Sequence, residues 1–208
     1  MLAVVPARAG SKRLPGKNFR PFLGASLVAR AALQALALNF VSRVVVSSDT
    51  REGVDIPPQA EFIMRSAELA RDDTSSQELA RHLWGVCGKG RRGLLWLQPT
   101  SPLRSLQDLQ AAHTLWGGEG RVVSATPGAG RHARLVRAGK FLETGVPRCD
   151  GDLEVNLNGA IYILDPESLQ AEDWVGGARA YLMPPERSVD IDTQEDWDEA
   201  IRMGQEQP

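Results

Sequence analysis

The sequence predicts an α/β fold: a three-layer sandwich in which helices cover both faces of a mostly parallel, doubly wound sheet. Two observations indicate this class. Short runs of consecutive apolar residues alternate with helix-like segments, and such runs are typical of parallel strands covered on both faces. The length of 208 residues also suits one domain with its own core, so we treat residues 1–208 as a single domain.

The first 125 residues carry the clearest alternation. The expected strands are 2–5, 43–48, 61–64, 94–97 and 121–125, and the expected helices are 26–38, 75–86 and 105–116. Serines stand where these helices begin. Ser26 and either Ser75 or Ser76 can accept a hydrogen bond from the first turn, which is typical of a helix N-cap.

The alternation breaks between residues 127 and 157, where Gly and Arg dominate and no long helix is visible. The pattern predicts a hairpin that pairs 134–136 with 141–142 around Ala138-Gly139, and we expect the stretch to form a small arm that projects from the sheet. Regular structure is expected again as strand 159–164, a short helix after Pro166, strand 180–183 and helix 194–203, which Thr193 can cap.

Composition excludes several classes of protein. The 24 Lys and Arg residues against 26 Asp and Glu residues give a net charge of −2, whereas a nucleic-acid-binding domain is usually basic. No apolar run approaches the roughly 20 residues that span a bilayer. The N-terminal apolar residues precede the charges, the reverse of a signal peptide, so we expect a cytoplasmic protein. The two cysteines are too few for a disulfide scaffold or a thiolate metal site.

The most informative segment follows the first strand and has the sequence PARAGSKRLPGKN, residues 6–18. It contains four cations, Arg8, Lys12, Arg13 and Lys17. Clustered cations and glycines at the carboxyl edge of a parallel sheet suit a polyphosphate ligand. The spacing is not that of a Walker A loop, because five residues separate Gly10 from Gly16 and Asn18 follows the lysine.

A second candidate is the turn QPTSP at the end of the fourth expected strand, residues 98–102. Its two prolines restrict the backbone around two hydroxyl residues. A rigid polar turn at this edge can present Gln98, Thr100 and Ser101 to a sugar, although a simple strand-to-helix connection is the plain alternative.

The acidic candidate is Asp190-Ile191-Asp192. In an extended chain both carboxylates would point to one face while their apolar neighbours pack inward, and two carboxylates on one face suit Mg²⁺. Most such pairs are surface residues, so spacing alone decides little. The similar pair Asp150 and Asp152 lies in the irregular segment, and we interpret it as part of a solvated turn.

Taken together, these segments resemble the acylneuraminate cytidylyltransferase family, whose first loop typically reads PARGGSKxxPxKN. The similarity comprises six blocks in the same order: residues 6–18, 44–49, 65–70, 97–104, 158–162 and 190–193. The first and fourth blocks are the specific ones. Related enzymes for the eight-carbon acid Kdo usually have Pro where Asn18 stands, which favours the nine-carbon branch.

The resemblance implies a Rossmann-like nucleotidyltransferase that joins the 2-hydroxyl of a 2-keto sugar acid to the α-phosphate of CTP and releases pyrophosphate. It implies catalytic roles for Lys17, Asn18 and Asp192, and a Mg²⁺ site at Asp190 and Asp192. The implied substrate-binding residues are Arg8, Ser11 and Lys12 for the phosphates, Arg65 and Ser76 near the cytidine, and Gln98, Thr100, Ser101, Arg148, Asn158 and Tyr162, with Arg148 as the ligand of the sugar carboxylate. Asp49 could support the nucleotide or the metal.

The resemblance also implies a homodimer, because the segment of the family equivalent to 127–157 forms part of the sugar pocket and reaches across to a partner. Here residues 131–157 are shorter than is usual, and the family's Arg-Gln-Asp-Leu-Pro-like run is replaced by 148–152. Two alternatives therefore stay open: another sugar nucleotidyltransferase, of Kdo type or with a different nucleotide, and a nucleotide-binding protein without turnover.

Overall fold

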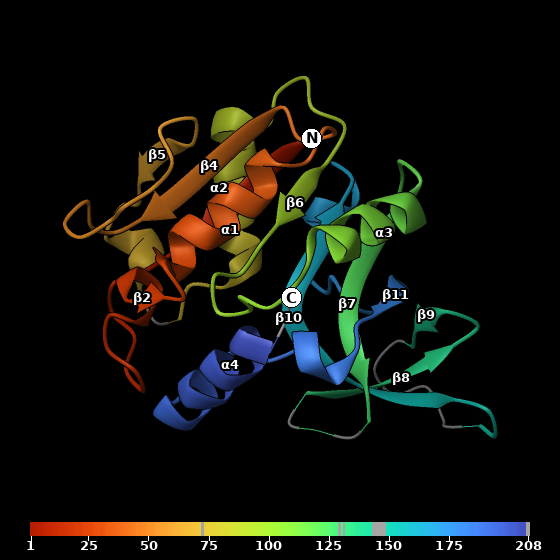
Figure 1. The fold of residues 1–208 in the computed structure, drawn as a ribbon. Helices are drawn as coiled ribbons and strands as arrows, with labels where there is room; N and C mark the ends of the chain where they lie inside the picture. The colour runs from red at the N-terminus through yellow and green to blue at the C-terminus, as the bar shows by residue number, and fades with distance from the viewer. Residues whose placement is uncertain (72, 129, 131, 143–148, 207–208) are drawn as a thin grey trace.

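The computed structural model describes residues 1–208 except 72, 129, 131, 143–148 and 207–208 (Figure 1). Its α-helices are α1 Leu27–Leu36, α2 Ser76–Cys87, α3 Leu106–Trp116 and α4 Gln194–Glu206. The strands of the first half are β1 Leu2–Pro6, β2 Pro21–Phe22, β3 Ala25–Ser26, β4 Arg43–Ser48, β5 Glu61–Met64 and β6 Leu94–Trp96. The remaining strands are β7 Arg121–Pro127, β8 Ala133–Arg137, β9 Lys140–Phe141, β10 Leu153–Leu164 and β11 Arg179–Leu182.

The main sheet has nine strands in the order β5-β4-β1-β6-β10-β7-β11-β9-β8, and it is mixed rather than mostly parallel. Strands β5, β4, β1 and β6 are parallel to one another, but β10 runs antiparallel to both β6 and β7. Parallel neighbours need a crossover connection. Between β7 and β10 the chain instead forms the β8–β9 hairpin, so β10 enters the sheet from the opposite end. The prediction of an α/β fold is confirmed. The prediction of a mostly parallel sheet is wrong for the part formed by β10, β7, β11, β9 and β8, where most pairings are antiparallel.

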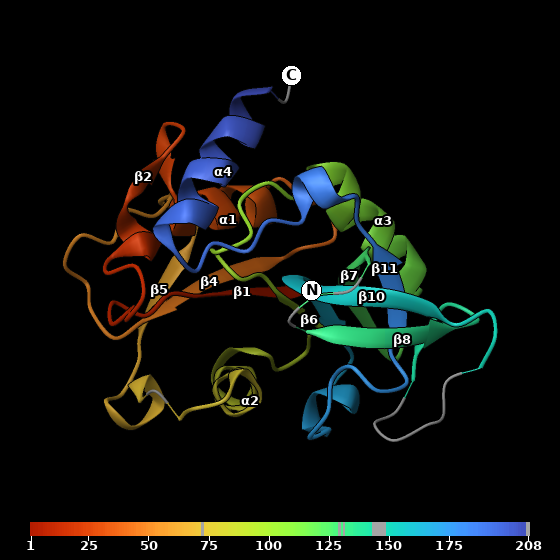
Figure 2. The same ribbon diagram turned by 90° about the horizontal axis from the view of Figure 1, so that it is seen from below.

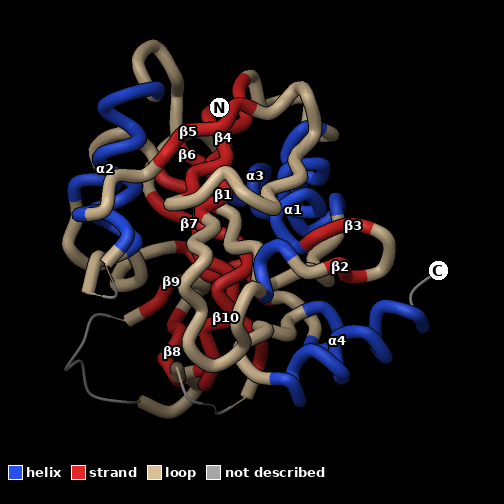
Figure 3. Tube along the Cα trace, turned by 90° about the vertical axis from the view of Figure 1, so that its left-hand side faces the viewer, coloured by secondary structure: helices blue, strands red, loops and turns tan. Residues whose placement is uncertain are grey.

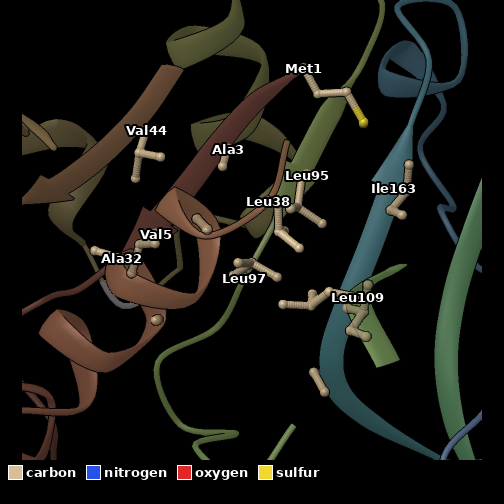
Figure 4. Packing of buried hydrophobic residues seen from close by; sticks show 14 of the residues in the cluster. Met1, Ala3, Val5, Ala32, Leu38, Val44, Leu95, Leu97, Leu109 and Ile163 are labelled. Carbon is tan, nitrogen blue, oxygen red and sulfur yellow. The ribbon is translucent and has the colours of Figure 1, made fainter. Parts of the chain in front are cut away.

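Helices cover both faces of the sheet, as the sandwich prediction requires (Figures 2 and 3). Ala3 and Val5 of β1 lie on the same face of the strand and pack in a core with α1 and α3, shown in Figure 4. The alternate positions Leu2 and Val4 pack in a second core with α2 on the other face. Every residue of β1 from Leu2 to Val5 is therefore fully buried, which explains its continuous apolar sequence.

The predicted helix starts are confirmed. The Ser26 side chain accepts from the backbone N–H of Ala29, and the Ser75 side chain accepts from Glu78. Ser105 begins α3 with a capping box in which Asp108 is the reciprocal partner. No helix in the described part of the chain is long and apolar enough to cross a membrane.

The predicted hairpin is also confirmed, and its strands β8 and β9 are part of the main sheet. Val136 pairs with Phe141 across a turn in which Ala138 and Gly139 have φ angles of 47° and 76°, as a two-residue hairpin turn of type I′ requires. Strand β8 pairs with β10 as well as β9, so β10, β7, β11, β9 and β8 close into a ring. Its interior has its own apolar cluster, which includes Val136, Phe141 and Val155. Strand β10 begins at Leu153, six residues earlier than predicted.

Candidate active site

A cavity of about 570 Å³ opens where the parallel strands β1, β5 and β6 end. Its lining comes from the segments that follow these strands, from the start of α2 and from the loop before α4. Eleven of the predicted site residues line it: Arg8, Ser11, Lys12, Lys17, Asn18, Arg65, Ser76, Gln98, Thr100, Asp190 and Asp192. The carboxyl edge of the parallel strands, where α/β proteins bind ligands, therefore collects most of the candidates.

The cationic loop after β1 is held in place by two hydrogen bonds. Asp49, at the end of β4, accepts from the backbone N–H of Ala9 at 2.8 Å. The amide of Asn18 donates to the carbonyl of Arg8 at 3.0 Å, which ties the two ends of the loop together. Gly16, with a φ of 69°, lets the chain turn into the 3-10 helix Lys17–Phe19. Asn18 thus shapes the loop, and its buried Oδ1 has no hydrogen-bond partner.

Lys17 joins this loop to the acidic segment. Its ammonium group donates to the carbonyl of Ile191 at 2.5 Å and to Oδ1 of Asp192 at 2.8 Å. Arg13 donates to the other oxygen of Asp192, Oδ2, at 2.5 Å. The Asp192 carboxylate is therefore held between two cations. These contacts join segments of the chain that are about 175 residues apart.

Asp190 lies deeper than Asp192, and its Oδ1 is buried without a hydrogen-bond partner. Burial raises the pKa of Asp190, as does the negative charge of Asp192, whereas a hydrogen bond with Thr100 and the charge of Lys17 oppose the shift. Two neighbouring carboxylates with an unpartnered buried oxygen fit a hard divalent cation such as Mg²⁺. No group of three or more His, Cys, Asp or Glu residues able to hold a metal occurs among the described residues, so phosphate oxygens and water would have to complete the coordination.

The acidic segment is part of a loop and not of a strand, but its apolar residue packs inward as expected. Ile191 is fully buried beside Trp197 of α4 and Phe22 of β2. Its backbone N–H donates to the carbonyl of Thr100 at 2.8 Å. Thr193 accepts from the backbone of Asp196 at the start of α4, as predicted. Packing and helix capping, rather than strand pairing, therefore position the two carboxylates.

The segment before Asp190 is anchored by an ion pair in which the carboxylate of Asp108 is buried and the Arg187 side chain is partly exposed. Arg187 donates to both oxygens of Asp108 at 2.8 and 3.0 Å, and the hydroxyl of Tyr181 donates to the same carboxylate at 3.0 Å. Burial alone would raise the pKa of Asp108, but hydrogen bonds from Arg187, Ser105 and Tyr181 outweigh it and lower the pKa. The Asp108 carboxylate thus caps the start of α3 and also holds Arg187, which lies three residues before Asp190.

The residues of the QPTSP turn have two different roles: some line the cavity and others pack behind it. Gln98 and Thr100 line the cavity, whereas Ser101 is fully buried and donates to the carbonyl of Asn158 at 3.2 Å. The fully buried Arg104 donates to the carbonyls of Gln98 and Ala160, and burial lowers its pKa to about 9. The turn is therefore fixed from behind, as its prolines suggested.

Two further predicted residues lie behind the cavity and one lies outside the described residues. The side chain of Asn158 accepts from the hydroxyl of Ser124 at 2.7 Å and donates to that of Ser188 at 3.0 Å. Tyr162 packs beside Trp174, does not line the cavity, and has its pKa raised to about 12 by burial and then by the charge of Asp190. Arg148 falls in the segment 143–148, outside the described residues.

The part of the cavity around Arg65 contains residues that sequence reasoning found and some that it missed. Arg65 donates to the carbonyl of Ser47 at 3.1 Å, its buried Nε has no partner, and burial lowers its pKa. The lining residues without a role assigned beforehand are Arg13, which was named only as a cation of the loop, and others that include Arg71, Thr74, Leu79 and Trp96. Arg13 was visible as a member of the cationic loop, but the apolar Leu79 and Trp96 look like ordinary core residues in sequence.

The pair Asp150 and Asp152 was only partly interpreted correctly. Residues 150 and 151 form a turn. However, Asp152 is not solvated: its side chain is 1% exposed and receives two hydrogen bonds from Arg137, at 2.7 and 2.9 Å. It also accepts from the backbone N–H of Cys149. Asp152 therefore closes the turn next to the β8–β9 hairpin.

Comparison with solved structures gives the same fold. The chain superimposes on CMP:2-keto-3-deoxy-manno-octonic acid synthetase complexed with CTP with a TM-score of 0.73 and 18% identity, covering 99% of both chains. It superimposes on 4-diphosphocytidyl-2C-methyl-D-erythritol synthase from Anaerococcus prevotii with a TM-score of 0.62 and 13% identity, covering 98% of this chain and 95% of that one. At such identities the likeness establishes the α/β fold alone.

Sequence comparison identifies the family. A family profile described as cytidylyltransferase matches residues 2–86. The CMP-N,N'-diacetyllegionaminic acid synthase of Legionella pneumophila is 30% identical, over 95% of this chain and 93% of that protein. The N-acylneuraminate cytidylyltransferase of Escherichia coli is also 30% identical, over 99% of this chain but 52% of that protein, so the chain spans about half of that relative. The resemblance seen in the six sequence blocks is thereby confirmed, and the chain belongs to the acylneuraminate cytidylyltransferase family.

Proposed function

We propose that this protein transfers CMP from CTP to the 2-hydroxyl of a sialic-type 2-keto-3-deoxy sugar acid and releases pyrophosphate. One observation carries the proposal: a single cavity is lined both by the cationic loop and by the Asp190 and Asp192 carboxylates. Binding a nucleotide alone does not require the acidic pair. A cavity of about 570 Å³ has the size of typical small-molecule sites.

In the cationic loop, Arg8, Lys12 and Lys17 would bind the triphosphate and stabilise the charge that develops on the leaving pyrophosphate. Ser11 would add a further donor. Asn18 acts here mainly by shaping the loop, because its amide donates to the Arg8 carbonyl. Arg65 and Ser76, which line the cavity beyond the loop, are assigned to the nucleoside.

In the reaction, the 2-hydroxyl oxygen forms a bond to the α-phosphorus while the bond from that phosphorus to the bridging β-phosphate oxygen breaks. The hydroxyl proton is lost to solvent, and pyrophosphate leaves with the bridging oxygen. Asp190 and Asp192 would hold Mg²⁺ together with phosphate oxygens. When bound, the metal would polarise the α-phosphate and lower the pKa of the attacking hydroxyl.

The sugar class follows from the relatives, which are named for diacetyllegionaminic, N-acylneuraminic and pseudaminic acids. Gln98 and Thr100 face the cavity from the QPTSP turn and are assigned to this acceptor. Arg148 is assigned to its carboxylate, since a guanidinium can bind a carboxylate with two hydrogen bonds. Ser101, Asn158 and Tyr162 would act indirectly, by holding the wall of the site.

We further propose a homodimer that uses the 127–157 region, by analogy with the equivalent segment of the family. Leu153 and Leu182, both about 40% exposed, lie on the ring of strands that contains this region. A cytoplasmic location stays a prediction from the sequence.

The test is a pyrophosphate-release assay with CTP and Mg²⁺ across a panel of 2-keto sugar acids that includes legionaminic, N-acetylneuraminic, pseudaminic and Kdo acids. We expect turnover with at least one nine-carbon acid, and CTP should be preferred over ATP, GTP and UTP. Asp192→Asn serves as the inactive control. Binding of CTP without release of pyrophosphate, with every acid in the panel, would favour the alternative of a nucleotide-binding protein.

A further inference from the structure

Asp192 is bound by two cations that differ in their freedom to move. Lys17 is 9% exposed as a residue, and its ammonium group is also tied to the Ile191 carbonyl. The Arg13 side chain is 52% exposed, and its guanidinium donates a hydrogen bond to Asp192. Arg13 also lines the cavity to which the triphosphate is assigned. Lys17 is therefore a fixed partner of Asp192, and Arg13 is an exchangeable one.

The contact between Arg13 and Asp192 competes with the binding of two ligands, a divalent cation and a triphosphate. A divalent cation that binds Asp192 must compete with the Arg13 guanidinium for the Oδ2 oxygen. A triphosphate that binds in the cavity offers the guanidinium other anionic oxygens, to which it binds with charge-assisted hydrogen bonds. Triphosphate binding draws Arg13 away from Asp192 and so frees the carboxylate for the metal. Metal binding to Asp192 releases Arg13 and so frees the guanidinium for the triphosphate. Because binding linkage is reciprocal, the metal should then favour the nucleotide by the same factor.

We propose that Arg13 is an exchangeable counter-ion of Asp192 that moves to the triphosphate when nucleotide binds, and so couples nucleotide binding to metal binding. The proposal rests on the proposed function, because it assumes a triphosphate in this cavity. Arg13 is assigned no part in the bond-making step; it acts by exchanging between Asp192 and the triphosphate. An exposed ion pair is worth about two- to fivefold in affinity, which sets the size of the expected effect.

The first experiment is a double-mutant cycle on CTP affinity in EDTA at fixed ionic strength, measured by calorimetry. Asp192→Asn frees Arg13, so CTP should bind more tightly. In the Arg13→Gln background the same substitution should give a gain that is smaller by about two- to fivefold. Equal gains in both backgrounds would overturn the proposal. Arg13→Lys, which keeps the charge, should restore most of the difference.

The second experiment measures Mn²⁺ binding to the protein without nucleotide, by the EPR signal of free Mn²⁺. Arg13→Gln should bind Mn²⁺ about two- to fivefold more tightly than wild type. Arg71→Gln is the matched control, because Arg71 lines the same cavity but pairs with Asp73. An equal rise in both variants would reduce the effect to general charge and overturn the proposal.

The two experiments separate the failure of this inference from failure of the proposed function. If wild type binds no CTP in either the presence or absence of metal, the proposed function is wrong. The Mn²⁺ measurement still decides whether Arg13 blocks Asp192. If CTP binds and turns over normally but Arg13→Gln changes neither the cycle nor Mn²⁺ affinity, the proposed function stands and the inference is wrong.

Discussion

Replacing Lys17 with Met separates the proposed catalytic role of its ammonium group from the packing role of its aliphatic stem. Methionine keeps an unbranched apolar chain in a position that is 9% exposed, and it removes the contacts to the Ile191 carbonyl and to Asp192. A buried carbonyl left without a donor costs about 1–3 kcal/mol, which we expect as a loss in the free energy of unfolding. Loss of a cation at the leaving phosphates should lower kcat/KM by about 10²- to 10³-fold, as removal of one preorganised donor does.

Stability is measured by urea denaturation followed by circular dichroism, and turnover by pyrophosphate release with CTP and Mg²⁺. Lys12→Ala is the companion variant, because Lys12 belongs to the same loop but is exposed. It should lower kcat/KM by at least about 10²-fold with a smaller loss of stability than Lys17→Met. Near-normal kcat/KM in both folded variants would refute the assignment of this loop to the triphosphate.

Four further outcomes are expected. Asp192→Asn should abolish activity or shift the Mg²⁺ requirement far upward with the fold intact, whereas Asp152→Asn should leave the Mg²⁺ titration unchanged; the opposite ranking would move the metal site into 127–157. Light scattering at micromolar concentration should give the mass of a dimer, and a fully active monomer would contradict this. Because the pKa of Asp108 is lowered in the folded state, the ionised carboxylate stabilises the protein above its unfolded pKa of about 3.9. The difference in the free energy of unfolding between wild type and Asp108→Asn should be constant near neutral pH and shrink as pH falls below about 4. A difference independent of pH down to about 2 would count against the ion pair. Gly159→Ala should lower both the free energy of unfolding and the activity, because the φ of 67° disfavours a side chain and the new Cβ would lie 3.1 Å from Oε1 of Gln98. Wild-type values of both would show that Gln98 can shift without cost.

The sequence predicted most elements of the fold because their signals are local. The apolar run of β1 and the serine at the start of α1 each depend on a few neighbouring residues. The direction of β10 is different. Its residues alternate and pack in the same way whether the strand enters the sheet from one end or the other, so the pattern could not distinguish a parallel from an antiparallel strand.

For the site, residue type predicted location better than role. The strand ends brought Gln98 and Thr100 to the cavity, yet Ser101, in the same turn, faces inward and binds the Asn158 carbonyl. A polar residue that supports a wall from behind looks the same in sequence as one that faces the ligand. Asp152 shows the same limit, because its partner Arg137 lies 15 residues away across a turn, where spacing gives no signal.

The contacts of Lys17 and Arg13 with Asp192 span 175 and 179 positions of the chain. Closing so long a loop is entropically costly and slow, so these contacts should form late in folding, after the locally encoded helices and the β1–β4 pairing. During synthesis the cationic loop leaves the ribosome long before its acidic partner exists. A nascent chain that stops before residue 190 can therefore present an exposed cluster of positive charge, able to bind polyanions such as RNA without specificity. Once synthesised, the acidic segment would neutralise this charge within the chain. We therefore expect salt to affect the interactions of the folding intermediate more than those of the folded enzyme.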